Sequence, residues 1–348
     1  MRRPEQTELM GLAFKRFCAR GRGRALLGAS ESLVMDAYAS LSPSGVAPSL
    51  YLEMPLLGEA CCDVGVGPYR KRGSFTLTDE FANGDARSFE IVRWLPRLGG
   101  QQDVFFGVDL DPQRDVPVSG AYVRHFGDLD VAREFYGITG SVAGFEGFRR
   151  ASERLPEGWL AVFAADYFGR DNSPLRLEAM LAPDVLGAVA SDAGALRDGL
   201  GSMGVPFVDD EMISLCQGLF RLGKSASFQF DVYPDGSLAG LLSATLFFSP
   251  PVQQESPPDE KRRTVQRSMS YLREAGMSDE RCQLLDEAAF AQGVPGIDDE
   301  GLLFDLALLC EPYCCKLKWV DGVLRPARWY QILRASVSPA TGGRRVKP

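Results

Sequence analysis

The chain has 348 residues, 45% of them hydrophobic, which is enough for two ordinary domains or one large closed architecture of helices and strands. Its formal net charge of −8 excludes a general nucleic-acid or membrane-surface binder, so any basic site must be local. No apolar run approaches the roughly 18 residues of a membrane helix, and no signal peptide follows residues 1–5. We therefore expect a cytoplasmic protein.

The cysteine and histidine content argues against a metal centre. There are eight cysteines but no Cys-x-x-Cys pair, and His125 is the single histidine. Zinc sites need ligands at close, regular spacing, which this chain lacks. We expect the cysteines to be small buried hydrophobic residues and His125 to be structural.

The first part of the chain alternates helical and strand-like segments. Residues 5–41 and 129–154 have helical patterns. Between them the strand-like runs are residues 49–55, 61–66, 88–95, 104–110 and 120–126.

The second part repeats the same order. Its strand-like runs come in pairs, at residues 159–167 with 175–181 and 226–233 with 238–248. Its helical stretches are residues 184–200, 208–221 and 259 to about 292, the last after a linker at 249–258. A final strand pair closes a single domain of residues 1–337, and residues 338–348 read as a loose tail.

The polar faces of these strands favour a closed sheet. Strands joined as hairpins are antiparallel, so a doubly wound parallel sheet is excluded, and no Gly-x-Gly-x-x-Gly follows a strand. Along residues 226–233 the apolar side chains alternate with Ser227, Gln229 and Asp231. An open sheet would leave such faces in bulk water. We predict an α+β fold of repeated αββα units, in which about ten antiparallel strands form a barrel with helices outside and a polar lumen.

The last hairpin carries the densest positive charge. Lys316 and Lys318 share one face of a strand because side chains alternate. A three-residue loop at Val320-Asp321-Gly322 would align them with Arg328, Tyr330 and Arg334, and Lys316, Lys318, Arg328 and Tyr330 would then form one anion site.

A different turn would separate the residues of that site. A two-residue turn would aim Arg328 and Tyr330 at the helices and leave the two lysines with Arg325. Pro326 could add a bulge and change the alignment again.

At this point the chain resembles the aromatic prenyltransferases of the ABBA type. The run Arg176-Leu177-Glu178-Ala179-Met180 is similar to the Arg-Leu-Lys-x-Tyr strand of their fungal indole branch. Arg176 matches the first diphosphate ligand there, whereas Glu178 replaces lysine and Met180 replaces tyrosine. The resemblance covers nearly the whole chain as architecture, and it implies a ten-stranded barrel with the active site inside. Glu53 lies roughly where the substrate-orienting glutamate of that family would lie.

The resemblance implies three kinds of site residue. Cations and hydroxyls stabilise a diphosphate leaving group, aromatic faces shield an allylic cation, and a carboxylate orients or deprotonates the acceptor. The candidates for the diphosphate are Arg124, Arg176, Lys316, Lys318, Arg328 and Tyr330. The candidates for the cation shield and acceptor are Tyr51, Tyr122 and Tyr233. Glu53 is the candidate base, with Glu178 and Asp231 as alternatives.

The function that follows is a metal-independent aromatic prenyltransferase of secondary metabolism. It would move an allylic group from dimethylallyl or geranyl diphosphate to an indole, a phenol or a peptide side chain. No Asp-Asp-x-x-Asp motif is present, so neither magnesium nor another cofactor is predicted. The alternative is a non-catalytic small-molecule or peptide-binding protein on the same barrel, and each cation could instead form a cross-strand salt bridge. We expect a monomer or a weak dimer that binds neither nucleic acid nor membranes.

Overall fold

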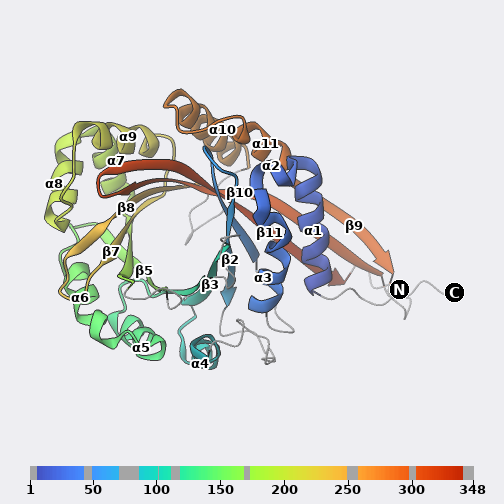
Figure 1. The fold of residues 1–348 in the computed structure, drawn as a ribbon, viewed down its shortest axis with the longest axis horizontal. Coiled ribbons are helices and arrows are strands. Elements are labelled where there is room, and N and C mark those ends of the chain that lie inside the picture. The colour runs from blue at the N-terminus through green and yellow to red at the C-terminus, as the bar shows by residue number, and fades with distance from the viewer. Residues whose placement is uncertain are drawn as a thin grey trace.

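A computed structural model describes residues 6–42, 49–69, 86–100, 102–110, 118–167, 173–248, 258–297 and 303–339. In this part of the chain, eleven strands form one antiparallel sheet in the order β11-β1-β2-β3-β4-β5-β6-β7-β8-β10-β9. A further pairing between β10 and β11 closes ten of these strands into a barrel, with helices on its outside (Figure 1).

The strands are β1 (Ser49–Pro55), β2 (Cys62–Tyr69), β3 (Asp103–Leu110), β4 (Val118–Arg124), β5 (Trp159–Asp166), β6 (Leu175–Leu181), β7 (Ala226–Val232), β8 (Leu238–Phe247), β9 (Phe290–Ile297), β10 (Leu303–Val320) and β11 (Val323–Pro339). The helices are α1 (Gln6–Gly21), α2 (Gly23–Leu27), α3 (Val34–Leu41), α4 (Ala86–Trp94), α5 (Leu129–Thr139), α6 (Val142–Glu153), α7 (Pro183–Ser191), α8 (Ala193–Met203), α9 (Asp210–Phe220), α10 (Pro258–Glu274) and α11 (Arg281–Ala288).

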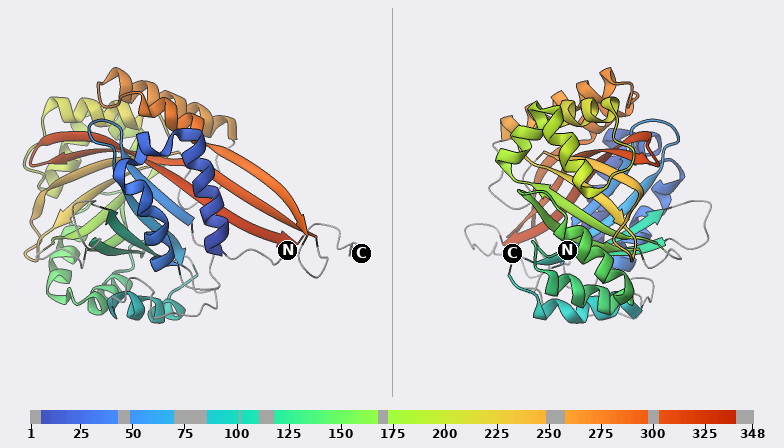
Figure 2. Two further views of the ribbon diagram at one scale, coloured as in Figure 1. Left: turned by 45° about the vertical axis from the view of Figure 1, so that its right-hand side comes forward. Right: turned by 90° about the vertical axis from the view of Figure 1, so that its left-hand side faces the viewer.

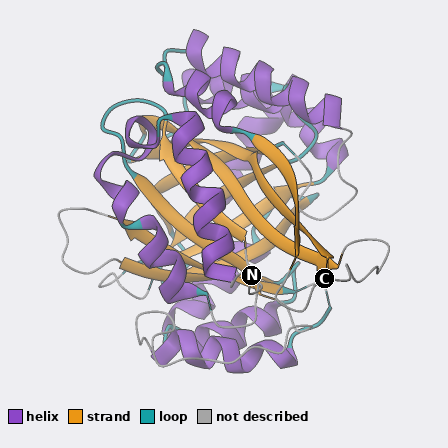
Figure 3. Ribbon diagram, turned by 90° about the vertical axis from the view of Figure 1, so that its right-hand side faces the viewer, coloured by secondary structure: helices purple, strands orange, loops and turns teal. Residues whose placement is uncertain are grey.

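The apolar core lies between the barrel and its helices. Phe228 of β7 is fully buried and packs against Phe220 of α9, with ring centroids 5.3 Å apart. Burying one such ring stabilises the fold by about 1.5–3 kcal/mol. The opposite face of the same strand carries Ser227 and Gln229 toward the lumen. Figure 3 shows the resulting layers, with strands inside and helices around them, as the alternation in the sequence predicts.

The helices start and stop where the sequence supplies caps. The carboxylate of Asp128 accepts the backbone N–H groups of Asp130 and Val131 at the start of α5. Gly140 ends the same helix with φ of 86°, a conformation that costs glycine little.

The strands β10 and β11 are longer than the barrel requires. The first half of β10 leaves the barrel and pairs with β9, and β11 accompanies it (Figures 1 and 2). Its second half stays in the barrel, between β8 and β11. The helix α1 contacts this three-stranded arm, so the extension is packed against the body on one face.

The αββα barrel predicted from the sequence is confirmed, but two segments differ. Residues 88–95 were expected to form a strand and instead lie mainly in α4. The β-branched pair Ile91-Val92 favours a strand locally, yet Ser88, Ile91 and Val92 are buried at the three- and four-residue spacing of a helix.

The second difference is β9, whose residues were partly assigned to a helix ending near residue 292. They pair with the first half of β10, from Phe290 opposite Cys310 to Ile297 opposite Leu303. The long-range pairing therefore decides their conformation. In the predicted tail, Ser338 and Pro339 are the last residues of β11, and residues 340–348 lie outside the described part.

Candidate active site

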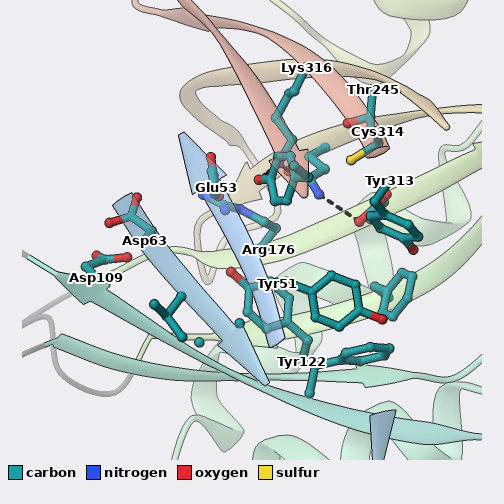
Figure 4. A pocket seen from close by; sticks show the side chains of 18 of the residues that line it. Tyr51, Glu53, Asp63, Asp109, Tyr122, Arg176, Thr245, Tyr313, Cys314 and Lys316 are labelled. Atoms are coloured by element: carbon teal, nitrogen blue, oxygen red, sulfur yellow. Dashed lines mark hydrogen bonds between the residues drawn. The ribbon is translucent and has the colours of Figure 1, made fainter. Parts of the chain in front are cut away.

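The lumen of the barrel holds a cavity of about 210 Å³ (Figure 4). Seven of the predicted site residues line it: Tyr51, Glu53, Tyr122, Arg176, Lys316, Lys318 and Tyr330. They come from β1, β4, β6, β10 and β11, so the closure of the sheet brings together residues almost 280 positions apart (Tyr51 to Tyr330). One wall is charged and the other is aromatic.

The last hairpin aligns Lys316 with Arg328 as predicted, but its turn differs from the predicted one. Val320 lies opposite Val323, so the turn has two residues, and Asp321 and Gly322 have positive φ of 51° and 76°. The predicted three-residue loop is therefore wrong. Lys318 lies opposite Arg325 but Lys316 lies opposite Arg328, so β11 gains one residue at this point.

That extra residue is a bulge at Pro326, and it restores the predicted alignment. Proline has no N–H for the ladder, so it fits a bulge. After the bulge, Lys316 pairs with Arg328 and Cys314 with Tyr330. Lys316, Lys318 and Tyr330 therefore lie together on the cavity wall, with Arg328 beside them, as the predicted alignment requires.

A second bulge puts Tyr313 into the lumen. Pro312 lies opposite Gln331 and Cys314 lies opposite Tyr330, so Tyr313 is the additional residue of β10. It lines the cavity and was not predicted. Arg334, which the predicted alignment also placed with the two lysines, is not on the cavity wall, and its guanidinium pairs with Glu311 at 2.8 Å.

A belt of hydrogen bonds links side chains of four strands of the wall, β6, β7, β10 and β11. Lys316 is 7% exposed, and its Nζ donates to the hydroxyl of Tyr330 at 2.7 Å and to Oε1 of Gln229 at 2.9 Å. The Nε2 of Gln229 donates to Oε2 of Glu178 at 2.7 Å. The hydroxyl of Ser227 donates to Oε1 of Glu178 at 2.6 Å.

Glu53 lies at the other end of this belt. It is directly opposite Tyr330 in the β1–β11 pairing, and the Tyr330 hydroxyl helps to lower its pKa. Burial alone would raise the pKa of Glu53, but the charges of Lys316 and Arg328 outweigh burial and lower it. Glu53 is therefore a carboxylate at neutral pH.

Two acidic residues that the sequence analysis missed extend this wall. Asp63 of β2 lies between Glu53 of β1 and Asp109 of β3, directly opposite each, and all three line the cavity (Figure 4). Burial, followed by the charges of Glu53 and Asp109, raises the pKa of Asp63 to about 7. The alternation on β2 and β3 could have identified both residues.

Two cations of the wall keep donors without a partner. Lys318 makes no hydrogen bond or ion pair with the residues that the structure describes, and Nη1 of Arg328 is buried without a hydrogen-bond partner among them. Burial lowers the pKa of Lys318, and so do the charges of Arg176 and Arg328, although Glu53 opposes this. The buried Nη1 of Arg328 is a costly donor unless it meets an anion.

The arginines of the facing wall are already paired. Arg176 forms an ion pair with Asp231, with Nε to Oδ1 at 2.8 Å, and also donates to the hydroxyl of Tyr167. Arg124 forms a buried ion pair with Asp103 at 2.9 Å and does not line the cavity. Both arginines therefore form cross-strand salt bridges, which the sequence analysis gave as the alternative to a diphosphate site.

Tyr233 lies outside the site. The strand β7 ends at Val232, and Tyr233 follows it, 45% exposed and not on the cavity wall. Its predicted place in the cation shield is wrong because the strand stops one residue earlier than expected.

Aromatic rings complete the wall beyond Glu53. Tyr51 packs against Phe105 and Tyr313, with ring centroids 5.8 and 5.3 Å apart. Phe105 packs against Phe163, and Phe247 against Tyr313. The hydroxyls of Tyr122 and Tyr167 are hydrogen-bonded to each other. Of these rings, only those of Tyr51 and Tyr122 were predicted.

Two glycines without side chains form part of the cavity wall. Gly107 of β3 lines the cavity directly opposite Gly65 of β2. A Cβ at Gly107 would lie 3.2 Å from Cε2 of Tyr122, so a larger residue would have to displace that ring.

Two structural findings bear on metals and membranes. The described residues contain no group of three or more His, Cys, Asp or Glu side chains placed to hold a metal ion. None of their helices combines the length and apolar character needed to cross a bilayer.

Comparison with protein-family models gives no match, and comparison with curated proteins gives none. Among solved structures, the chain is similar to apo prenyltransferase PriB, with a TM-score of 0.54 and 16% identity over 95% of this chain and 96% of that chain. It is also similar to PriB in complex with L-tryptophan and dimethylallyl thiolodiphosphate, with a TM-score of 0.51 and 16% identity over 99% and 100% of the chains. For NotF prenyltransferase, the TM-score is 0.50 and the identity 11% over 94% and 93%. At these identities the likeness shows the fold, which is the PT-barrel of the aromatic prenyltransferases.

Proposed function

We propose that this protein is an aromatic prenyltransferase that moves an allylic group from dimethylallyl or geranyl diphosphate to an aromatic acceptor. One observation carries the proposal: Lys318 and Arg328 hold open donors beside a cavity that also contains Glu53 and an aromatic wall. The PriB complex adds support, since that barrel was crystallised with an aromatic amino acid and an allylic diphosphate analogue.

The diphosphate would bind on the β10–β11 side of the lumen. Lys318 and Arg328 supply open donors there, and Lys316 has a third proton beyond those given to Gln229 and Tyr330. Charge-assisted hydrogen bonds of this kind stabilise the leaving group as negative charge develops on it. The allylic C–O bond then breaks, and both of its electrons leave with the diphosphate.

The allylic cation would be held by the aromatic wall. The faces of Tyr51, Phe105, Tyr313 and Phe247 can stabilise a cation by cation–π attraction and exclude water that would quench it. The π electrons of the acceptor ring form the new bond to the allylic carbon.

The acceptor would lie against Glu53. Because its pKa is lowered, Glu53 is ionised at neutral pH and can accept a hydrogen bond from an indole N–H or a phenol O–H. After bond formation the ring must lose one proton to regain aromaticity. Glu53 receives it, and Asp63, opposite it with a pKa of about 7, is suited to take it onward.

The assay for this proposal is turnover without added magnesium. The purified chain is incubated with dimethylallyl or geranyl diphosphate and a panel of indoles, phenols and aromatic peptides. Diphosphate release together with a prenylated product in the mass spectrum is the expected result. Lys318→Met has a side chain of similar length without the ammonium group. It is the matched control variant and should lose most of this activity.

A binding protein without turnover remains a second candidate because of one observation. Arg176, which matches the first diphosphate ligand of the related strand, is already paired with Asp231. Tight binding of an acceptor without any product would favour this candidate. Absence of both diphosphate binding and product would overturn the enzyme proposal.

A further inference from the structure

Glu178 stands where the related strand has lysine, and the structure gives it a different task. It is 6% exposed, and each of its oxygens accepts one hydrogen bond, from Ser227 and from Gln229. Neither donor is a cation, so Glu178 is not part of a salt bridge. What its carboxylate fixes is the orientation of an amide.

The direction of the belt follows from this orientation. Glu178 accepts from Nε2 of Gln229, so the carbonyl oxygen of that amide faces the opposite way. There it accepts from the ammonium of Lys316, which can only donate. If the amide turned over, its N–H groups would face the ammonium and the contact would be lost.

The same ordering continues to Glu53. The ammonium of Lys316 also donates to the oxygen of Tyr330, so the proton of the Tyr330 hydroxyl is left to point toward Glu53, which lies directly opposite in the β1–β11 pairing. Two of the three ammonium protons are thereby placed, and the third is available to the cavity. The hydrogen-bond partners of Lys316 are neutral, and its charge acts on the nearby carboxylate of Glu53 without a direct ion pair among the described residues.

We propose that Glu178 is a positioning residue, which acts through the amide of Gln229 to aim Lys316 at the diphosphate and the Tyr330 hydroxyl at Glu53. This inference rests on the proposed function, since it assumes that an anion binds beside Lys316. It assigns a role to the acidic residue that replaces a lysine in the family pattern. That role needs an acceptor at position 178 and does not need a negative charge.

Two substitutions at this position separate the role from a charge effect. Glu178→Gln removes the negative charge but keeps an acceptor oxygen for Gln229, because Ser227 can accept from the new amide. Glu178→Met has a similar length, removes the charge as well and offers no comparable acceptor. A pure charge effect would make both variants bind an anion more tightly than the wild type, and by the same factor.

The positioning role predicts a difference between the two variants. We expect Glu178→Met to bind inorganic diphosphate roughly tenfold more weakly than Glu178→Gln, as for the loss of one oriented charge-assisted hydrogen bond. Isothermal titration calorimetry measures this without turnover. In the Gln229→Met background the difference should fall below about twofold, because the connecting amide is gone.

Several outcomes would contradict the inference. Equal affinities of the Gln and Met variants, or a difference that persists in the Gln229→Met background, would show that Glu178 acts by charge or by direct contact. If Glu178→Met does not fold, Gln229→Met alone should weaken diphosphate binding by a similar factor. An unchanged affinity in Gln229→Met would contradict the positioning role of Glu178.

The failure of the enzyme proposal is distinguishable from this. Wild-type protein that binds diphosphate but forms no prenylated product refutes the enzyme and leaves the calorimetric comparison intact. If the wild type binds no diphosphate, the crystal structures of the two variants decide. The positioning role predicts that the hydrogen bond from Lys316 to Gln229 is kept in Glu178→Gln and lost in Glu178→Met. A hydrogen bond kept in both variants would refute it.

Discussion

Positively charged side chains on the two sides of the barrel have different partners. On β4 and β6, Arg124 and Arg176 are each neutralised by an aspartate of a neighbouring strand. On β10 and β11, Lys316 is held by an amide and a hydroxyl, and Lys318 has no partner among the described residues. Charge held by acids stabilises the barrel, whereas charge held by neutral groups stays available to an anion. The residue that matches a family motif, Arg176, thus lies on the occupied wall.

The largest effect is expected at the Arg124–Asp103 pair. Arg124→Met leaves the carboxylate of Asp103 buried without its cation, which should lower the free energy of unfolding by about 3–5 kcal/mol. Urea unfolding measures the loss, and the double variant Arg124→Met, Asp103→Leu should recover much of it. A loss below about 1 kcal/mol in the single variant would show that this wall does not depend on its ion pair.

The reverse result is expected at Lys318. Lys318→Met should weaken diphosphate binding by roughly tenfold to a hundredfold, since a charge-assisted contact is lost, while the melting temperature stays close to that of the wild type. Calorimetry and thermal unfolding measure the two quantities. Unchanged affinity with a large loss of stability would place Lys318 in the structural class of Arg124.

Asp63 should make stability depend on pH. Its pKa in the folded protein is about 7, above the ordinary 3.8, so it favours folding at low pH and loses this contribution as the pH rises from about 4 to about 7. Asp63→Asn should therefore raise the melting temperature by a few degrees at pH 8 and change it little at pH 4. Equal shifts at both pH values would contradict the raised pKa.

The smallest effect is expected at Tyr233, which is exposed beyond the end of β7. Tyr233→Ala should change kcat and KM less than about twofold, whereas Tyr51→Ala, on the cavity wall, should lower kcat at least tenfold. Steady-state kinetics with one acceptor compares them. Similar losses of kcat in both variants would show that Tyr233 belongs to the site.

Alternation along strands was enough to predict the barrel and the charged wall. Tyr51, Glu53, Tyr122 and Arg176 could be assigned to the lumen because their strands carry a regular two-residue period through these positions. The same rule could have identified Asp63 and Asp109, which lie on the polar faces of β2 and β3.

The rest of the site depends on bulges, and of these the local sequence indicated only the one at Pro326. Val162 is an extra residue in β5, since Ala161 lies opposite Ala179 but Phe163 lies opposite Glu178. The bulge turns Phe163 into the lumen, although Ala161 before it faces the core. Tyr313 enters the lumen in the same way. Each bulge is fixed by the pairing of strands that the closed barrel brings together.

The most direct measurement is a crystal structure of the protein with dimethylallyl thiolodiphosphate bound. The account predicts diphosphate oxygens within hydrogen-bond distance of Lys318 and Arg328, with the allylic chain toward Tyr51 and Tyr313 and the Arg176–Asp231 pair intact. A diphosphate bound to Arg176 with Asp231 displaced, while Lys318 stays without a partner, would contradict it.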